Sequence, residues 1–209
     1  MSTLIHIKIL ICIIMIIYIL YIGKKEVIEG FENKKYTYSN NGCGHVADVG
    51  YVCPLIYKDN DITIKQFSEC DKDNQHKIAK HILDEWGSDI GVTDIKSTLE
   101  FIKSHWSNTD VFYTMIKNDS NEVVGCIGID RDNFYPYISH LYVIPEYRKN
   151  KYSLKLMRFA EKIIKDISFS ESRLWCIKEL RGFYEKQGYE IENKISKKGK
   201  ENLIMVKKI

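Results

Sequence analysis

The sequence has no excess of charge of one sign. Its 31 Lys and Arg stand against 28 Asp and Glu, which gives a formal net charge of +3 over 209 residues, and the two signs are interspersed. Nucleic-acid-binding domains gather Lys and Arg on one face, so this balance argues against a nucleic-acid partner. The length and the apolar fraction of 44% suit one globular domain with an appendage.

Closely spaced cysteines are also scarce. Most of the six Cys are far apart and no C-x-x-C occurs, so the spacing does not predict a zinc site. The stretch GCGHVADVGYVC does bring Cys43, His45 and Cys53 near one another in sequence. We expect it to be a linker that packs on the domain, with a metal or a disulfide as the alternative, and we predict no metal cofactor.

Strongly polar residues are nearly absent from residues 4–22, LIHIKILICIIMIIYILYI, where His6 and Lys8 are the exceptions. A bilayer span needs roughly 20 apolar residues, so we predict a transmembrane anchor over residues 1–23. A cleaved signal peptide and a hydrophobic helix of the fold are the alternatives, although LYIGKK lacks the small residues of a cleavage site. Lysines that follow the run predict, by the positive-inside rule, a single-pass membrane protein whose globular domain is cytosolic. These are Lys24, Lys25, Lys34 and Lys35.

Two further segments follow the apolar run. Residues 24–60 are polar, with clusters of Gly, Asn and Lys and no sustained period, and we expect them to form a linker. Residues 61–209 show regular patterns throughout and predict one folded domain.

The domain is predicted to open as strand, helix, helix. ITIKQF at residues 62–67 alternates apolar and polar residues as a half-buried strand does. Apolar residues at helical spacing predict amphipathic helices over residues 78–86 and 95–106. Thr93 or Asp94 is the expected N-cap of the second helix.

Three strands are predicted next. VFYTMIK at residues 111–117 and VVGCIGID at residues 123–130 flank the polar turn NDSNE, and together they predict a β-hairpin. YISHLYV at residues 137–143 follows the break at Pro136 as the third strand.

The C-terminal part alternates helices and strands. SLKLMRFAEKIIKDI at residues 153–167 carries one apolar helical face, RLWCI at residues 173–177 predicts a strand, and LRGFYEKQGY predicts a short helix that ends at Gly188. Alternating stretches at residues 189–195 and 203–206 complete the sheet. The predicted fold class is α/β (α+β), with a mixed, mostly antiparallel central sheet flanked by helices.

This order of elements, together with two motifs, resembles the GNAT family of N-acetyltransferases over residues 62–209. In LYVIPEYRKNKYSLKLM a strand ends in a turn that opens a helix, where the family has Arg-x-x-Gly-x-Gly or Ala; Lys151 and Ser153 stand at the glycine positions. LRGFYEKQGYEI is similar to the second family motif. The resemblance implies the GNAT fold, here preceded by the transmembrane helix.

The resemblance implies acetyl-CoA as cosubstrate. A turn that leads into a helix N-terminus presents unpaired N–H groups and the positive end of the helix dipole, which suits a diphosphate. The implied cofactor-binding residues are strand residues near the thioester and turn residues near the diphosphate. They are Leu141, Tyr142, Val143, Arg148, Lys149, Asn150, Lys151, Tyr152 and Ser153.

The turn lacks the glycines that favour positive φ and close approach to phosphate. We expect cationic side chains to replace part of the backbone cradle, Asn150 to tolerate left-handed geometry, and Ser153 to cap the helix or bond a phosphate oxygen. The alternative is a solvated basic turn.

The resemblance aligns Tyr184 with the tyrosine that in many members protonates the departing thiolate. A phenol with a pKa of about 10 is protonated at neutral pH and can do so; the alternative is a core tyrosine. For the general base, Tyr137 and Ser139 occupy the usual positions without being obvious bases. His140 is expected, by strand alternation, to face away from Ser139. Ordered water and two acids after the hairpin, Asp130 and Asp132, are further alternatives.

The leading hypothesis is a membrane-tethered N-acetyltransferase that transfers acetyl from acetyl-CoA to a primary amine by direct attack in a ternary complex. The alternative is a catalytically degenerate GNAT-fold binding or scaffolding module. The acceptor is open to small molecules and to peptides or proteins, because the fold acetylates small amines, peptide N-termini and lysine side chains alike.

Overall fold

The structure is a computed structural model, and it divides the chain into two units, Met1–Thr37 and Tyr38–Ile209. It describes residues 36–38, 44–46, 50–52, 55–105, 111–131, 135–197 and 199–209. The predicted anchor at residues 1–23 lies outside the described residues. Among the helices of the described part of the chain, none has the length and apolar character to cross a membrane.

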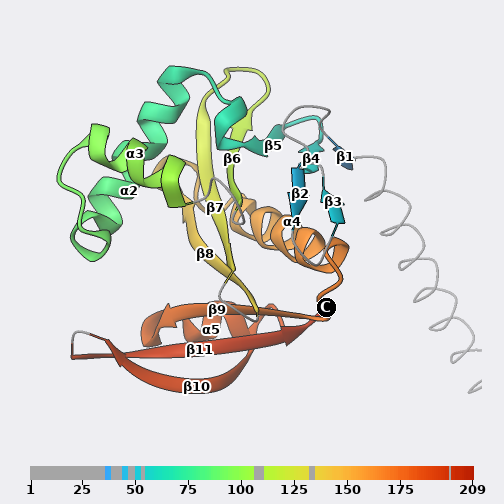
Figure 1. The fold of residues 1–209 in the computed structure, drawn as a ribbon, viewed down its shortest axis with the longest axis vertical. Helices are drawn as coiled ribbons and strands as arrows, with labels where there is room; N and C mark the ends of the chain where they lie inside the picture. The colour runs from blue at the N-terminus through green and yellow to red at the C-terminus, as the bar shows by residue number, and fades with distance from the viewer. Residues whose placement is uncertain are drawn as a thin grey trace, which may run out of the picture. The chain divides into compact units, whose positions relative to one another are not determined.

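The second unit is built on a mixed sheet in the order β4-β5-β6-β7-β8-β9-β11-β10 (Figure 1). Neighbouring strands run antiparallel except β8 and β9, which run parallel. The predicted mixed, mostly antiparallel sheet is therefore confirmed. The strands are β4 (Leu55–Lys58), β5 (Ile62–Gln66), β6 (Val111–Lys117), β7 (Val123–Arg131), β8 (Pro136–Val143), β9 (Glu171–Ile177), β10 (Glu190–Lys197) and β11 (Lys200–Lys208).

Strands also occur within the predicted linker. β1 (Tyr36–Tyr38) spans the boundary between the two units, and β2 (Gly44–Val46) pairs antiparallel with β3 (Gly50–Val52). The strand β4 adds residues to the main sheet that were predicted to be linker. It pairs with β5, and its residues Leu55 and Tyr57 are buried. A strand of four residues is too short to show a period in the sequence.

Two helices cover one face of the sheet, α2 (Lys72–Ile90) and α3 (Ile95–His105) (Figure 1). The Asp94 carboxylate accepts the Ser97 N–H at 2.8 Å, so Asp94 rather than Thr93 caps α3. Apolar residues of both helices pack with sheet residues of β6, β7 and β8 in one core. That core contains Phe67, Ile78, Ala79, Ile82, Ile102, Phe112, Val123, Cys126 and Tyr142.

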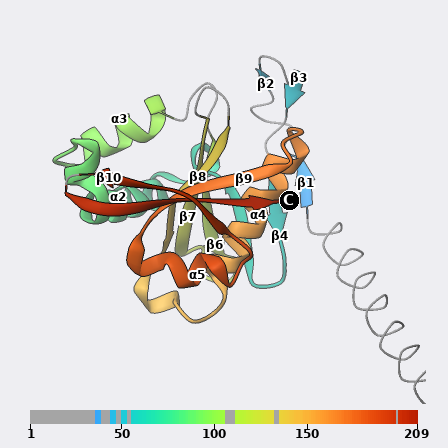
Figure 2. The same ribbon diagram turned by 90° about the horizontal axis from the view of Figure 1, so that it is seen from below.

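The helix α4 (Tyr152–Asp166) covers the opposite face, where the rings of Tyr113 and Phe159 lie 4.8 Å apart. A short helix, α5 (Arg181–Glu185), follows β9 and lies across β9 and β11 from α3 (Figure 2). It ends earlier than predicted: Gly188 belongs to the turn after it, with φ at +87°. The central strand β8 therefore lies between the two helical layers.

Candidate active site

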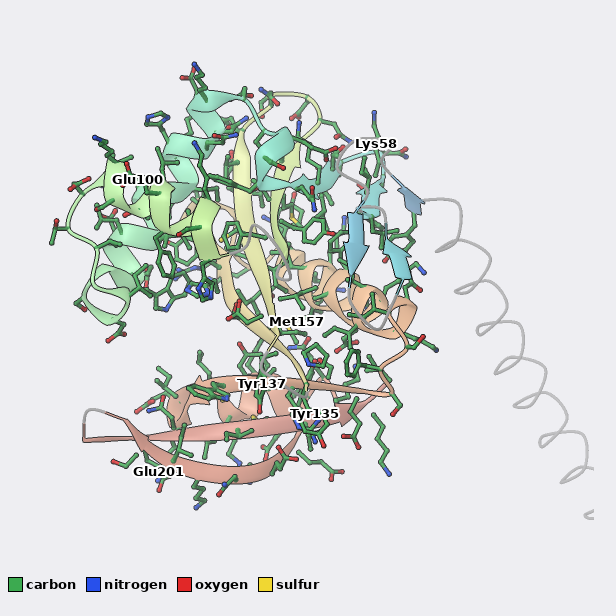
Figure 3. The ribbon with its side chains drawn as sticks, viewed as in Figure 1. Lys58, Glu100, Tyr135, Tyr137, Met157 and Glu201 are labelled. Atoms are coloured by element: carbon green, nitrogen blue, oxygen red, sulfur yellow. The ribbon has the colours of Figure 1, made fainter. Side chains whose placement is uncertain are left out.

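The parallel strands β8 and β9 stay together over only two residue pairs. Tyr137 pairs with Arg173 and Ile138 with Leu174, and beyond these β8 continues against β7 while β9 continues against β11 (Figure 1). We call this divergence, with β8 residues Ser139–Val143 on one arm and β9 residues Trp175–Ile177 on the other, the strand fork. Figure 3 shows Tyr137 at its closed end, between the upper strands and the layer of β9, β11 and β10. Because no strand of the described residues pairs with the β8 arm on that side, backbone groups there are available to a ligand.

A β-bulge shapes the β8 arm. The register between β7 and β8 slips by one residue, since Gly128 pairs with Ser139 whereas Cys126 pairs with Tyr142, and His140 has φ at +47°. A Cβ on Gly125 would lie 2.2 Å from the Tyr142 carbonyl oxygen, so only glycine permits this close approach.

His140 lies at this bulge and faces the helix α2. Strict alternation places side chains two residues apart on the same face of a strand. The His140 ring meets the ring of Trp86 on α2 at 5.0 Å, and Trp86 also meets Tyr142 at 6.0 Å. His140 and Tyr142 therefore both face α2, two residues apart.

His140 is a poor general base in this setting. Burial, with a smaller contribution from the charge of His105, lowers its pKa from the ordinary 6.5 to about 4. An imidazole with so low a pKa does not retain a proton at neutral pH.

The basic turn after β8 adopts the backbone that glycine would favour. Lys149 and Lys151 both have left-handed φ, at +69° and +59°. For a residue with a Cβ this conformation costs roughly 1–2 kcal/mol. The turn therefore keeps the positive-φ geometry without glycine, and the side chains of Lys149, Asn150 and Lys151 are exposed.

The start of α4 shows that the capping role predicted for Ser153 is wrong, while the predicted bond to a phosphate oxygen stays a prediction. The helix begins at Tyr152, its N-cap is Lys151, and no side chain caps it. The Lys151 carbonyl accepts the N–H groups of Leu154 and Lys155 at 3.1 and 3.2 Å. Ser153 thus lies inside the first turn, and the main-chain N–H groups of Tyr152 and Ser153 precede the first bonds of the helix, as anion-binding N–H groups do.

Arg148 fastens the turn to β8. Its Nε donates to the Val143 carbonyl oxygen at 3.0 Å, and its guanidinium carbon lies 5.7 Å from the centre of the Tyr142 ring. The side chain thereby couples the basic turn to the β8 arm of the strand fork.

An acidic turn between β4 and β5 holds the first turn of α4 from the other side. The Tyr152 hydroxyl donates to Asp61 at 2.7 Å, and the Lys155 ammonium donates to Asp59 at 2.8 Å. Burial raises the pKa of Asp59, but hydrogen bonds from Lys155 and from the N–H groups of Ile62 and Asp61 outweigh it and hold the pKa at about 2. Sequence reasoning missed both acids because they follow directly on the short strand β4.

Tyr184 lies against the other arm of the fork. It is buried on α5, its ring is 6.1 Å from that of Tyr189, and burial followed by the charge of Cys176 on β9 raises its pKa. Such a phenol remains protonated at neutral pH.

The other predicted bases are spread along β7 and β8. Asp130 pairs in register with Tyr137 at the closed end of the fork, and the Ser139 hydroxyl is buried without a hydrogen-bond partner among the described residues. Asp132, like Cys43 and Cys53, lies outside the described residues. Within the described ranges, no group of three or more His, Cys, Asp or Glu could hold a metal ion.

Three solved structures share the fold. An aminoglycoside 6'-N-acetyltransferase complexed with coenzyme A matches with a TM-score of 0.59 and 17% identity, covering 69% of this chain and 96% of that chain. The aminoglycoside 6'-N-acetyltransferase from Enterococcus faecium matches at 0.54 and 18%, covering 69% and 96%. A GNAT-family acetyltransferase from Staphylococcus aureus Mu50 matches at 0.53 and 20%, covering 70% and 98%.

Sequence comparison gives the family. No curated protein sequence matches the chain. The family model for the acetyltransferase (GNAT) family, however, matches residues 76–189, which run from α2 into the second motif and include the bulge, the basic turn and Tyr184. The chain therefore belongs to the GNAT acetyltransferase family, which confirms the enzyme class predicted from the sequence, an acetyl-CoA-dependent N-acetyltransferase.

Proposed function

We propose that this chain transfers the acetyl group of acetyl-CoA to a primary amine by direct attack in a ternary complex. The observation that carries the proposal is the strand fork, whose β8 arm leads directly into a basic turn and an uncapped helix N-terminus. One continuous segment, residues 141–153, can then bind both the thioester beside the β8 arm and the diphosphate at the start of α4.

The residues of that segment fit the cosubstrate. We assign Leu141, Tyr142 and Val143 to the acetyl-bearing arm, where main-chain donors polarise the thioester carbonyl and stabilise its oxyanion. The turn residues Arg148, Lys149, Asn150, Lys151, Tyr152 and Ser153 take the diphosphate. The first-turn N–H groups supply directed donors there and the exposed lysines supply charge.

Tyr184 is the proposed acid. As the thioester bond breaks, the sulfur of coenzyme A takes a proton from the phenol, whose raised pKa keeps it protonated until that moment. The position of Tyr184 on α5, next to β9, supports this role because it brings the donor from the arm of the fork opposite to Leu141.

We further propose that residues 1–23 anchor the enzyme in a membrane with the domain in the cytosol. The support is the apolar run at residues 4–22 and the lysines that follow it. If the full-length protein is released from membranes by alkaline carbonate washing, the anchor proposal is wrong.

The transfer reaction is tested with the full-length chain, acetyl-CoA and a panel of amines, by release of free thiol. The panel holds an aminoglycoside, a polyamine, a peptide with a free N-terminus, and an N-blocked peptide with one lysine. Amine-dependent thiol release with at least one acceptor is expected. Acetyl-CoA binding without thiol release would instead support the alternative, a degenerate binding module.

A further inference from the structure

A histidine and a carboxylate meet on the α3 side of the strand fork. We infer that His105 is the general base that takes the proton from the acceptor amine, and that Asp130 is its positioning residue. The inference rests on the acetyl transfer proposed above.

The two side chains come from different elements and converge at the closed end of the fork. His105 is the last residue of α3, and its Nε2 lies 3.8 Å from Oδ1 of Asp130 on β7. Asp130 in turn pairs in register with Tyr137, which is the first β8 residue to pair with β9. The side chains are 43% and 29% exposed, so a substrate can reach both.

The packing of α3 holds the His105 ring in one orientation. Its ring stacks on Phe101 one turn earlier, with ring centroids 5.0 Å apart and planes 15° apart, which fixes the plane of the imidazole. The titratable groups facing His105 from other elements include Asp130 on β7 and His140 on β8.

The other candidates on this side are weaker bases. His140 is half-buried, with its pKa lowered to about 4. Tyr137 and Ser139 carry hydroxyl groups, which are protonated at neutral pH. An imidazole accepts a proton in the neutral range, and His105 also has an acidic partner.

The proton balance closes with these groups. The acceptor ammonium gives one proton to His105, and the neutral nitrogen attacks the acetyl carbon, forming the C–N bond. The C–S bond breaks, the thiolate takes the proton of Tyr184, and the new amide nitrogen returns its surplus proton to the Tyr184 phenolate. His105 then releases its proton to water. The 3.8 Å separation is long for a hydrogen bond, as is common for catalytic pairs before substrate binds.

The test uses the full-length enzyme, acetyl-CoA and the panel amine that gives the fastest thiol release, between pH 6 and 9. For His105→Gln we expect kcat to fall at least about 100-fold, with acetyl-CoA affinity by calorimetry unchanged and the acidic limb of the pH–rate profile abolished. Asp130→Asn should lower kcat about tenfold with acetyl-CoA affinity unchanged, because the imidazole loses the carboxylate that positions it.

Matched controls come from α2. His76→Gln changes an exposed histidine whose Nδ1 lies 2.7 Å from the Lys72 carbonyl oxygen, and Asp84→Asn changes an exposed acid paired with Lys80 at 2.9 Å. Both should keep the wild-type profile.

Three results would overturn the inference. Wild-type kcat and an intact acidic limb in His105→Gln would remove His105 from the base role while leaving acetyl transfer in place. Loss of acetyl-CoA binding together with turnover would make His105 a structural residue. If the wild type releases no thiol with any amine of the panel, the proposed function fails and the inference falls with it.

Discussion

Gly125 is the residue on which the geometry of the β8 bulge depends most directly. An added Cβ would lie 2.2 Å from the Tyr142 carbonyl oxygen, 3.2 Å from the Tyr142 carbonyl carbon and 3.2 Å from the Val143 Cα. Relieving the shortest contact requires β7 and β8 to separate locally by about 1 Å, in a sheet packed to crystal-like density. Forced overpacking of this kind costs about 1–3 kcal/mol.

We therefore expect Gly125→Ala to lower the free energy of unfolding by about 1–3 kcal/mol, measured by urea denaturation. It should also weaken acetyl-CoA binding, because the displaced residues, Tyr142 and Val143, belong to the proposed cofactor arm. Gly182→Ala is the matched control. Gly182 lies in α5, where an added Cβ would meet no described atom within 4 Å beyond the adjacent residues and backbone of its own helix, so the change should stabilise the helix by up to about 1 kcal/mol. A Gly125→Ala protein as stable as wild type would refute the close approach and with it the bulge.

Three further predictions address the proton donor Tyr184, the half-buried His140 and the basic turn. Tyr184→Phe should lower turnover about 100-fold or more with acetyl-CoA affinity nearly unchanged, and unchanged turnover would remove Tyr184 from the acid role. Because the folded pKa of His140 is about 4 against an ordinary 6.5, its contribution to stability is fully present above pH 6.5. That contribution, at most roughly 3 kcal/mol, is lost as the pH falls to 4. In urea denaturation, the free energy of unfolding of His140→Gln should fall less than that of the wild type between pH 6.5 and pH 4. An identical pH dependence in the two proteins would contradict the low pKa of His140. Lys151→Gly should remove the left-handed strain of about 1–2 kcal/mol, and the backbone entropy that glycine loses on folding should offset part of this gain. It should also reduce the salt dependence of acetyl-CoA binding by calorimetry, and an unchanged dependence would show that the Lys151 charge has no part in binding.

The elements that the sequence predicted well are those with a local signal. The β6–β7 hairpin and the amphipathic helix α4 can be predicted from the spacing of their apolar residues. In each of these elements that spacing repeats several times along the sequence. The sequence also predicts Thr93 or Asp94 as the N-cap of α3, because capping depends on residues within one turn of the helix start.

The features that sequence reasoning missed depend on contacts between distant residues. The bulge at His140 arises where Gly125 approaches Tyr142 across two strands, and no local pattern marks such an approach. His105 and Asp130 are brought together by the packing of α3 on the sheet. Lys151 and Ser153 were predicted to stand at the family's glycine positions, but only the structure shows that Lys149 and Lys151 adopt the left-handed backbone in this turn.

The account rests on the claim that the strand fork and the basic turn together hold acetyl-CoA. Calorimetric titration of the full-length chain with acetyl-CoA, repeated at low and high salt, tests it most directly. We predict saturable binding of one acetyl-CoA per chain that weakens strongly as salt rises, because exposed lysines replace the glycine cradle. Absence of binding at millimolar acetyl-CoA would contradict the claim.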